Sequence, residues 1–132
     1  PTEVAARVAA RGLGGRTLVI FQPHRYSRTA ALREEFGRCF GDADRVWILD
    51  VYAAGEAPIE GATGESLAES AKAAGARHVT YASDAHVAAA EAAEMARSGD
   101  TVITLGAGDI TKLGDEVLAH LRRNAPTEGV RR

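Results

Sequence analysis

The segment richest in side chains that could bind a ligand or take part in chemistry is Phe21–Thr29, which reads FQPHRYSRT. Its basic side chains are His24, Arg25 and Arg28. A guanidinium presents a planar fork of N–H donors that matches the two oxygens of a carboxylate or a phosphate. Two guanidiniums so close together predict a site for an anionic ligand. Ser27 and Thr29 follow as candidate caps for a helix that begins in this segment.

Two other segments combine polar side chains with glycine-rich backbone, at Tyr52–Thr63 and at Gly106–Asp109. The first offers Tyr52, Gly55 and Glu56. The second offers free backbone N–H groups at the start of a helix, where the helix dipole also favours an anion; its members are Gly106, Gly108 and Asp109. A plainer interpretation is that these glycines only form a tight turn and that the arginines lie on a solvated surface.

The elements around these segments alternate between strand and helix. Apolar, β-branched runs predict strands at Thr17–Phe21, Arg45–Val51, His78–Ala82 and Thr101–Leu105. Helical periodicity predicts helices at Glu3–Arg11, about Thr29–Phe40, about Glu65–Ala74, from the Asp84 cap to about Arg97, and from Ile110 onward. This alternation predicts one α/β domain, a three-layer α/β/α Rossmann-like parallel sheet with helices on both faces.

A strand order of 3-2-1-4 would place the first and fourth strands side by side at a switch point. The three polar segments each follow the carboxyl end of a strand, and parallel strands bring those ends to one edge. We therefore expect a ligand cleft at this edge.

Composition excludes several classes of function. The net charge of −2 gives no support for a nucleic-acid binder, and no apolar run approaches the roughly 20 residues of a membrane span. The single cysteine, Cys39, excludes an internal disulfide and is expected as a buried thiol. The other histidines lack metal-ligand spacing, so we expect no metal site; they are His78, His86 and His120.

Nucleotide and hydrolase motifs are incomplete. Gly106-x-Gly108 is followed by Thr111 where the dinucleotide pattern needs a third glycine, and no G-x-x-x-x-G-K-[ST] phosphate loop occurs. The chain is therefore not expected to hold an ATP phosphate tail by itself. No G-x-S-x-G element is present either.

The motifs FQPHRYSRT, DVYAAGEAPIEGATGESL and TLGAGDITKLG, with the opening PTEVAARV, resemble the carboxy-terminal domain of the UDP-N-acetylmuramate–L-alanine ligase family. The resemblance spans Pro1 to about Leu121. It implies a Mur ligase carboxy-terminal domain over residues 1–123 and a polar, frayed tail over 124–132. The start at Pro1, without a methionine, fits a piece of a longer protein whose UDP-binding and ATP-binding domains precede this one.

Such a ligase is cytoplasmic and joins L-alanine to UDP-N-acetylmuramic acid in peptidoglycan synthesis. ATP, with Mg²⁺, converts the muramoyl carboxylate to an acyl phosphate, which the alanine amine attacks. The resemblance implies that the carboxy-terminal domain supplies part of the amino-acid site and closes over ATP. Alone it would be inactive, with no catalytic residue of its own and no bound cofactor.

The resemblance also implies residue roles. His24, Arg25 and Arg28 would bind L-alanine, with the two arginines holding its carboxylate. Tyr52, Gly55 and Glu56 would line the cleft, and Gly106, Gly108 and Asp109 would support the closed state on the ATP side. Three alternatives stay open: the same domain of the murein tripeptide recycling ligase, a free-standing module that binds a small anion, and an interaction domain whose arginines face a protein partner.

Overall fold

The computed structural model describes residues 15–124, apart from residues 39, 42, 77 and 107. Its strands are β1 (Thr17–Gln22), β2 (Arg45–Leu49), β3 (Val79–Ala82) and β4 (Thr101–Gly106). Its helices are α2 (Tyr26–Arg38), α3 (Gly64–Ala73), α4 (Ala85–Met95) and α5 (Ile110–Asn124). The predicted helix at Glu3–Arg11, the thiol of Cys39 and the tail beyond Asn124 lie outside the described residues.

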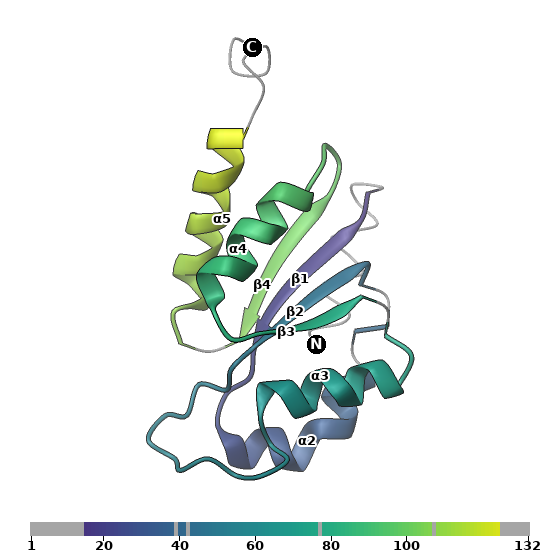
Figure 1. Cartoon of the computed structure of the whole chain (residues 1–132), viewed down its shortest axis with the longest axis vertical. Coiled ribbons are helices and arrows are strands. Elements are labelled where there is room, and N and C mark those ends of the chain that lie inside the picture. The colour runs from purple at the N-terminus through teal and green to yellow at the C-terminus, as the bar shows by residue number, and fades with distance from the viewer. Residues whose placement is uncertain (1–14, 39, 42, 77, 107, 125–132) are drawn as a thin grey trace.

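The four strands form one parallel sheet in the order β3-β2-β1-β4, which confirms the predicted fold class and strand order (Figure 1). β1 is the central element, since it pairs with β2 on one side and with β4 on the other. Its residues from Thr17 to Phe21 are all buried. Burial on both faces explains why this strand reads as an unbroken apolar run in the sequence.

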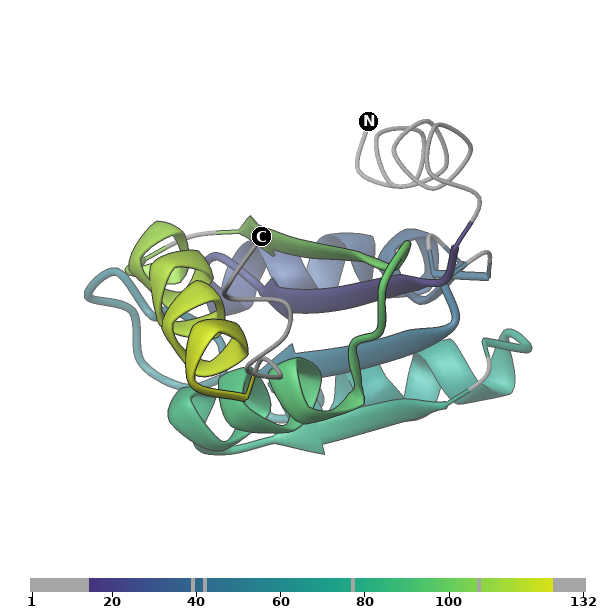
Figure 2. The ribbon, with the colours of Figure 1, turned by 90° about the horizontal axis from the view of Figure 1, so that it is seen from above.

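Side chains alternate between two cores along β1. Leu18 and Ile20 pack with alanines of α4 and with the apolar face of α5. Val19 and Phe21 face the opposite way and pack with Phe40 and with the buried face of α3. In the view of Figure 2, α4 and α5 lie in front of the strands and α2 and α3 lie behind them, so both faces of the sheet are covered.

Local capping fixes the starts of two helices. Thr63 and Ser66 form a reciprocal capping box at the start of α3. The side chain of Asp84 accepts a hydrogen bond from the His86 backbone N–H, which confirms the predicted cap of α4. The strand expected from His78 instead begins at Val79, because His78 adopts a positive φ of 52°.

An ion pair joins β1 to β4 at the amino edge of the sheet. The Asp100 carboxylate accepts hydrogen bonds from the Arg16 backbone N–H at 3.0 Å, from Arg16 Nη2 at 2.7 Å and from the Arg97 backbone N–H at 2.9 Å. The Asp100 side chain is only 6% exposed. The hydrogen bond from Arg16, which is the largest cause, and the backbone donors lower the Asp100 pKa from 3.8 to about 2.

We expect Asp100→Asn to lower the free energy of unfolding by about 1–2 kcal/mol at neutral pH. Because the folded-state pKa is lowered, the carboxylate stabilises the fold above pH 4 and stops doing so as the pH falls towards 2. The difference in the free energy of unfolding between the original chain and the variant should therefore shrink as the pH falls from 4 to 2. Urea unfolding at several pH values measures it, with the exposed Asp115→Asn as a control; a pH-independent difference would contradict the assignment.

Candidate functional site at the carboxyl edge of the sheet

The loops that follow β1 and β2 are joined through their backbones. The Tyr52 N–H donates to the Pro23 carbonyl, and the Arg25 N–H donates to the Tyr52 carbonyl, both at 2.8 Å. His24 and Tyr52 form an isolated parallel bridge, and their ring centroids are 5.9 Å apart. The first two predicted segments therefore lie together, as parallel strand ends require.

Arg25 occupies a left-handed backbone conformation with φ of 64°. A non-glycine residue in this region costs of order 1 kcal/mol and needs support from its surroundings. The Arg25 carbonyl accepts hydrogen bonds from the Thr29 N–H at 3.1 Å and from Thr29 Oγ1 at 2.8 Å. Together with the bond to Tyr52, these contacts hold the Arg25 backbone on both sides.

The prediction that Ser27 or Thr29 caps the helix is wrong, because α2 begins earlier, at Tyr26. Both residues lie inside its first turn. The hydroxyl of Thr29 points back to the Arg25 carbonyl, and that of Ser27 donates to Glu56. Local sequence alone could not distinguish these partners from a cap.

The three basic side chains predicted to bind the ligand are all exposed: His24, Arg25 and Arg28. Within the described part of the chain, no ion pair involves either arginine. The guanidiniums therefore keep their donors available for an anion. Carboxylates and phosphates are the groups that such a planar fork binds with two parallel hydrogen bonds.

Glu56 takes part in the site through Ser27. Its carboxylate accepts a hydrogen bond from the Ser27 backbone N–H at 3.1 Å and one from Ser27 Oγ at 2.6 Å. The hydrogen bonds from Ser27 are the largest causes that lower the Glu56 pKa, and the charge of Arg25 lowers it further. Ala54 and Gly55 precede Glu56 with φ of 52° and 89°, so a turn delivers the carboxylate to α2.

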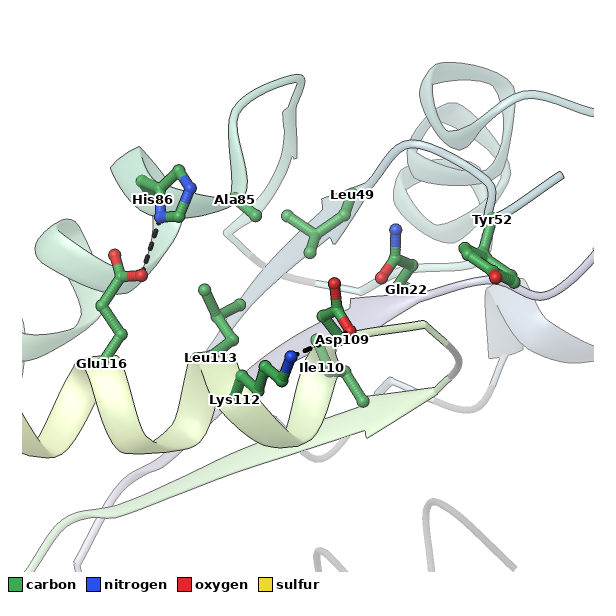
Figure 3. A pocket seen from close by; sticks show the side chains of 10 residues that line it. All are labelled: Gln22, Leu49, Tyr52, Ala85, His86, Asp109, Ile110, Lys112, Leu113 and Glu116. Carbon is green, nitrogen blue, oxygen red and sulfur yellow. Dashed lines mark hydrogen bonds and ion pairs between the residues drawn. The ribbon is translucent and has the colours of Figure 1, made fainter. Parts of the chain in front are cut away.

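A pocket of about 360 Å³ lies beside this loop junction, on the side of α4 and α5 (Figure 3). Its lining residues are Gln22, Leu49, Tyr52, Ala85, His86, Asp109, Ile110, Lys112, Leu113 and Glu116. Of the predicted site residues, Tyr52 and Asp109 line it, whereas the three basic residues of the first loop do not. The volume lies in the range of small-molecule sites.

Two compensated charge pairs line this pocket, and sequence analysis did not identify them. His86 Nδ1 lies 2.7 Å from Glu116 Oε1, and this hydrogen bond raises the pKa of His86 (Figure 3). Lys112 Nζ lies 3.9 Å from Asp109 Oδ1. His86 and Glu116 lie 30 positions apart on different helices, so the sequence carries no local signal for the first pair.

The third loop packs against the second. Gly106 and Gly108 have φ of 123° and 69°. A Cβ atom on Gly108 would lie 3.0 Å from Tyr52 Cδ2 and 3.1 Å from Gln22 Oε1. The Asp109 carbonyl accepts from the Leu113 N–H at 3.2 Å, which starts α5. The exposed carboxylate of Asp109 places negative charge at this helix start, beside the backbone N–H donors that the sequence predicts there.

At the second strand end, Tyr81 and Asp50 interact directly. The Tyr81 hydroxyl donates to Asp50 Oδ1, and this bond is the main cause that raises the pKa of Tyr81 to about 12. The Asp50 carbonyl accepts from Gln22 Nε2 at 3.2 Å. The Asp50 side chain therefore joins β3 to the site edge.

Across the described residues, no cluster of three or more acidic, histidine or cysteine side chains could hold a metal ion. The same part of the chain contains no helix that is long and apolar enough to span a bilayer.

Gly108→Ala should lower the free energy of unfolding by about 2–3 kcal/mol, since an alanine at positive φ also displaces the Tyr52 ring. Gly55→Ala is the matched control, because its φ is also positive while nothing lies within 4 Å of the added Cβ. Gly55→Ala should lower the free energy of unfolding by only about 1 kcal/mol. Fluorescence of the single, buried Trp47 reports the unfolding; equal losses would show that the Tyr52 contact contributes nothing.

Comparison with known proteins places this site in a family. The family described as "Mur ligase, glutamate ligase domain" matches residues 1–108. The UDP-N-acetylmuramate–L-alanine ligase of Mycolicibacterium smegmatis is 49% identical over 127 residues, which cover 92% of this chain and 26% of the relative. The enzyme of the same name from Mycobacterium tuberculosis H37Rv is 46% identical over 140 residues, which cover 96% of this chain and 27% of that relative.

A solved domain from Haemophilus ducreyi, titled as part of a UDP-N-acetylmuramate:L-alanyl-gamma-D-glutamyl-diaminopimelate ligase, superposes with a TM-score of 0.52. It shares 13% identity and covers 90% of this chain and 80% of that one, so it supports the fold alone. The chain spans about a quarter of the length of the curated relatives it matches. Since the family match extends over most of its residues, the chain belongs to the Mur ligase family as a glutamate ligase domain.

Proposed function

We propose that this chain is the carboxy-terminal domain of an ATP-dependent UDP-N-acetylmuramate–L-alanine ligase, which acts in the cytoplasm in peptidoglycan synthesis. The observation that carries the proposal is the 49% identity to an enzyme of that name over 92% of the chain. The exposed guanidiniums of Arg25 and Arg28, which form no ion pair with the residues that the structure describes, support it, because the incoming amino acid brings a carboxylate to the reaction.

In this proposal the domain acts by positioning. Arg25 and Arg28 hold the carboxylate of L-alanine, with His24 beside them, so that the amine points out of the edge of the sheet. Orienting a reactant in this way can supply several kcal/mol of the activation barrier. The group that the amine attacks is presented by the preceding domains, so this chain alone is inactive.

ATP supplies the activation of the muramoyl carboxylate, and we assign ATP and Mg²⁺ to the preceding domains. The start of α5 fits no direct phosphate contact, because the exposed Asp109 carboxylate would repel one. We propose that Gly106 and Gly108 instead shape the edge that closes near the nucleotide. Their positive φ angles allow the loop to lie against Gln22 and Tyr52.

The test of the function is phosphate release by the full-length protein with ATP and UDP-N-acetylmuramic acid, with and without L-alanine. Release that depends on L-alanine supports the proposal. Release only with the L-alanyl-γ-D-glutamyl tripeptide would instead identify the recycling ligase. No release with either amine donor would favour a binding or interaction module.

We expect Arg28→Ala and Arg25→Ala each to raise the KM for L-alanine by about 10–100-fold in the full-length enzyme. Loss of a charge-assisted hydrogen bond costs roughly 1.5–3 kcal/mol, and each 1.4 kcal/mol is a factor of ten. The KM for ATP should change little. Arg38→Ala, at the exposed far end of α2, is the control. An unchanged KM and turnover in both variants would remove these arginines from the site.

A further inference from the structure

The most directional side-chain contact at the carboxyl edge joins Glu56 to Ser27. The two residues are 29 positions apart, and both carboxylate oxygens are engaged, Oε1 by the Ser27 N–H and Oε2 by the Ser27 hydroxyl. A bidentate arrangement fixes the orientation as well as the distance between the two groups. We name this pair of hydrogen bonds the Ser27–Glu56 clasp.

The Ser27–Glu56 clasp lies within the segment that carries the two arginines. Ser27 lies between Arg25 and Arg28, whose exposed guanidiniums form the basic site. The Arg25 backbone is already held by Tyr52 and Thr29. The clasp adds a fixed point immediately before Arg28, so the segment that sets the spacing of the two guanidiniums is anchored at both ends.

α2 also needs an acceptor from outside its own sequence. The first N–H groups of a helix have no partner within the helix, and a negative charge near them is favourable. The first turn of α2 contains no acidic residue. Glu56 supplies the missing carboxylate from the loop after β2, and its engagement with Ser27 explains why it forms no ion pair with the nearby Arg25.

We propose that Glu56 is a positioning residue, which acts through Ser27 to fix the start of α2 and thereby the spacing of the Arg25 and Arg28 guanidiniums that receive the amino-acid carboxylate. This inference rests on the proposed function. It assigns Glu56 a role through Ser27 rather than through contact with the substrate, because both of its oxygens are directed at the Ser27 N–H and hydroxyl.

The experiment measures steady-state kinetics of the full-length enzyme carrying Glu56→Gln, Ser27→Ala and the double substitution. Each single variant should raise the KM for L-alanine by about 5–20-fold, less than the loss of a guanidinium itself, because Glu56 and Ser27 act on the substrate only through the position of the arginines. The KM values for ATP and UDP-N-acetylmuramic acid should stay within about twofold. Because both substitutions break one clasp, the double variant should resemble the more affected single variant.

Matched variants separate the clasp from general effects. Glu60→Gln removes a neighbouring carboxylate on the same loop. The Glu60 side chain is exposed and makes no hydrogen bond to the described residues, so this variant should leave the three KM values and the turnover unchanged. Glu56→Asp keeps the charge but shortens the reach, and should behave like Glu56→Gln. Ser27→Thr keeps the hydroxyl and should regain most of the affinity that Ser27→Ala loses.

Several outcomes would overturn the inference. Multiplicative effects in the double variant would show that Glu56 acts on the substrate independently of the Ser27 hydroxyl. Unchanged kinetics in both single variants would show that the clasp does not set the site. A parallel rise in all three KM values with a lower Tm would show a purely structural role. If the unchanged protein released no phosphate with L-alanine, the proposed function itself would fail, and the clasp's role with it.

Discussion

Two backbone hydrogen bonds between the first two loops organise the whole carboxyl edge. They join Tyr52 to Pro23 and Arg25 to Tyr52, and they continue the pairing of β1 and β2 past the ends of the strands. Because these bonds involve only backbone groups, the relative position of the two loops does not depend on which side chains the loops carry. The Ser27–Glu56 clasp and the packing of Gly108 on Tyr52 are both possible only once Tyr52 is held there.

The edge is divided electrostatically into two parts, with Tyr52 at the boundary. On the side of α4 and α5, His86 is paired with Glu116 and Lys112 lies near Asp109, so positive and negative groups compensate one another. On the side of α2, Glu56 is engaged by Ser27, and within the described residues no acidic partner pairs with the arginines. Under the proposed function the amino-acid carboxylate binds on the α2 side, where Arg25 and Arg28 lie, whereas the pocket of about 360 Å³ lies on the side of α4 and α5.

The fold class and the strand order could be predicted from the sequence because they depend on patterns within short segments. The apolar run of β1 and the alternation of strands with helices predict a parallel sheet, and the structure confirms the order β3-β2-β1-β4. The start of α2 could not be predicted, since its acceptor, Glu56, lies 29 residues away. The His86–Glu116 pair was missed for the same reason, because its two residues belong to different helices and lie 30 positions apart. The Asp109–Lys112 pair has a local i,i+3 spacing, and sequence analysis overlooked it. Residue types and spacing predicted a basic site for an anion, and the motif resemblance proposed L-alanine as its ligand, but no periodicity could have revealed which contacts hold the basic segment.

The left-handed conformation of Arg25 indicates how this edge is adapted to its task. Glycine or asparagine would adopt φ of 64° with less strain, so a bulky arginine at this position needs its surroundings to hold it. The supporting bonds come from three different places: the loop after β2, Thr29 in α2 and, two residues on, the Glu56 carboxylate. A backbone held in this way loses little further entropy when a ligand binds, so more of the electrostatic attraction remains as affinity.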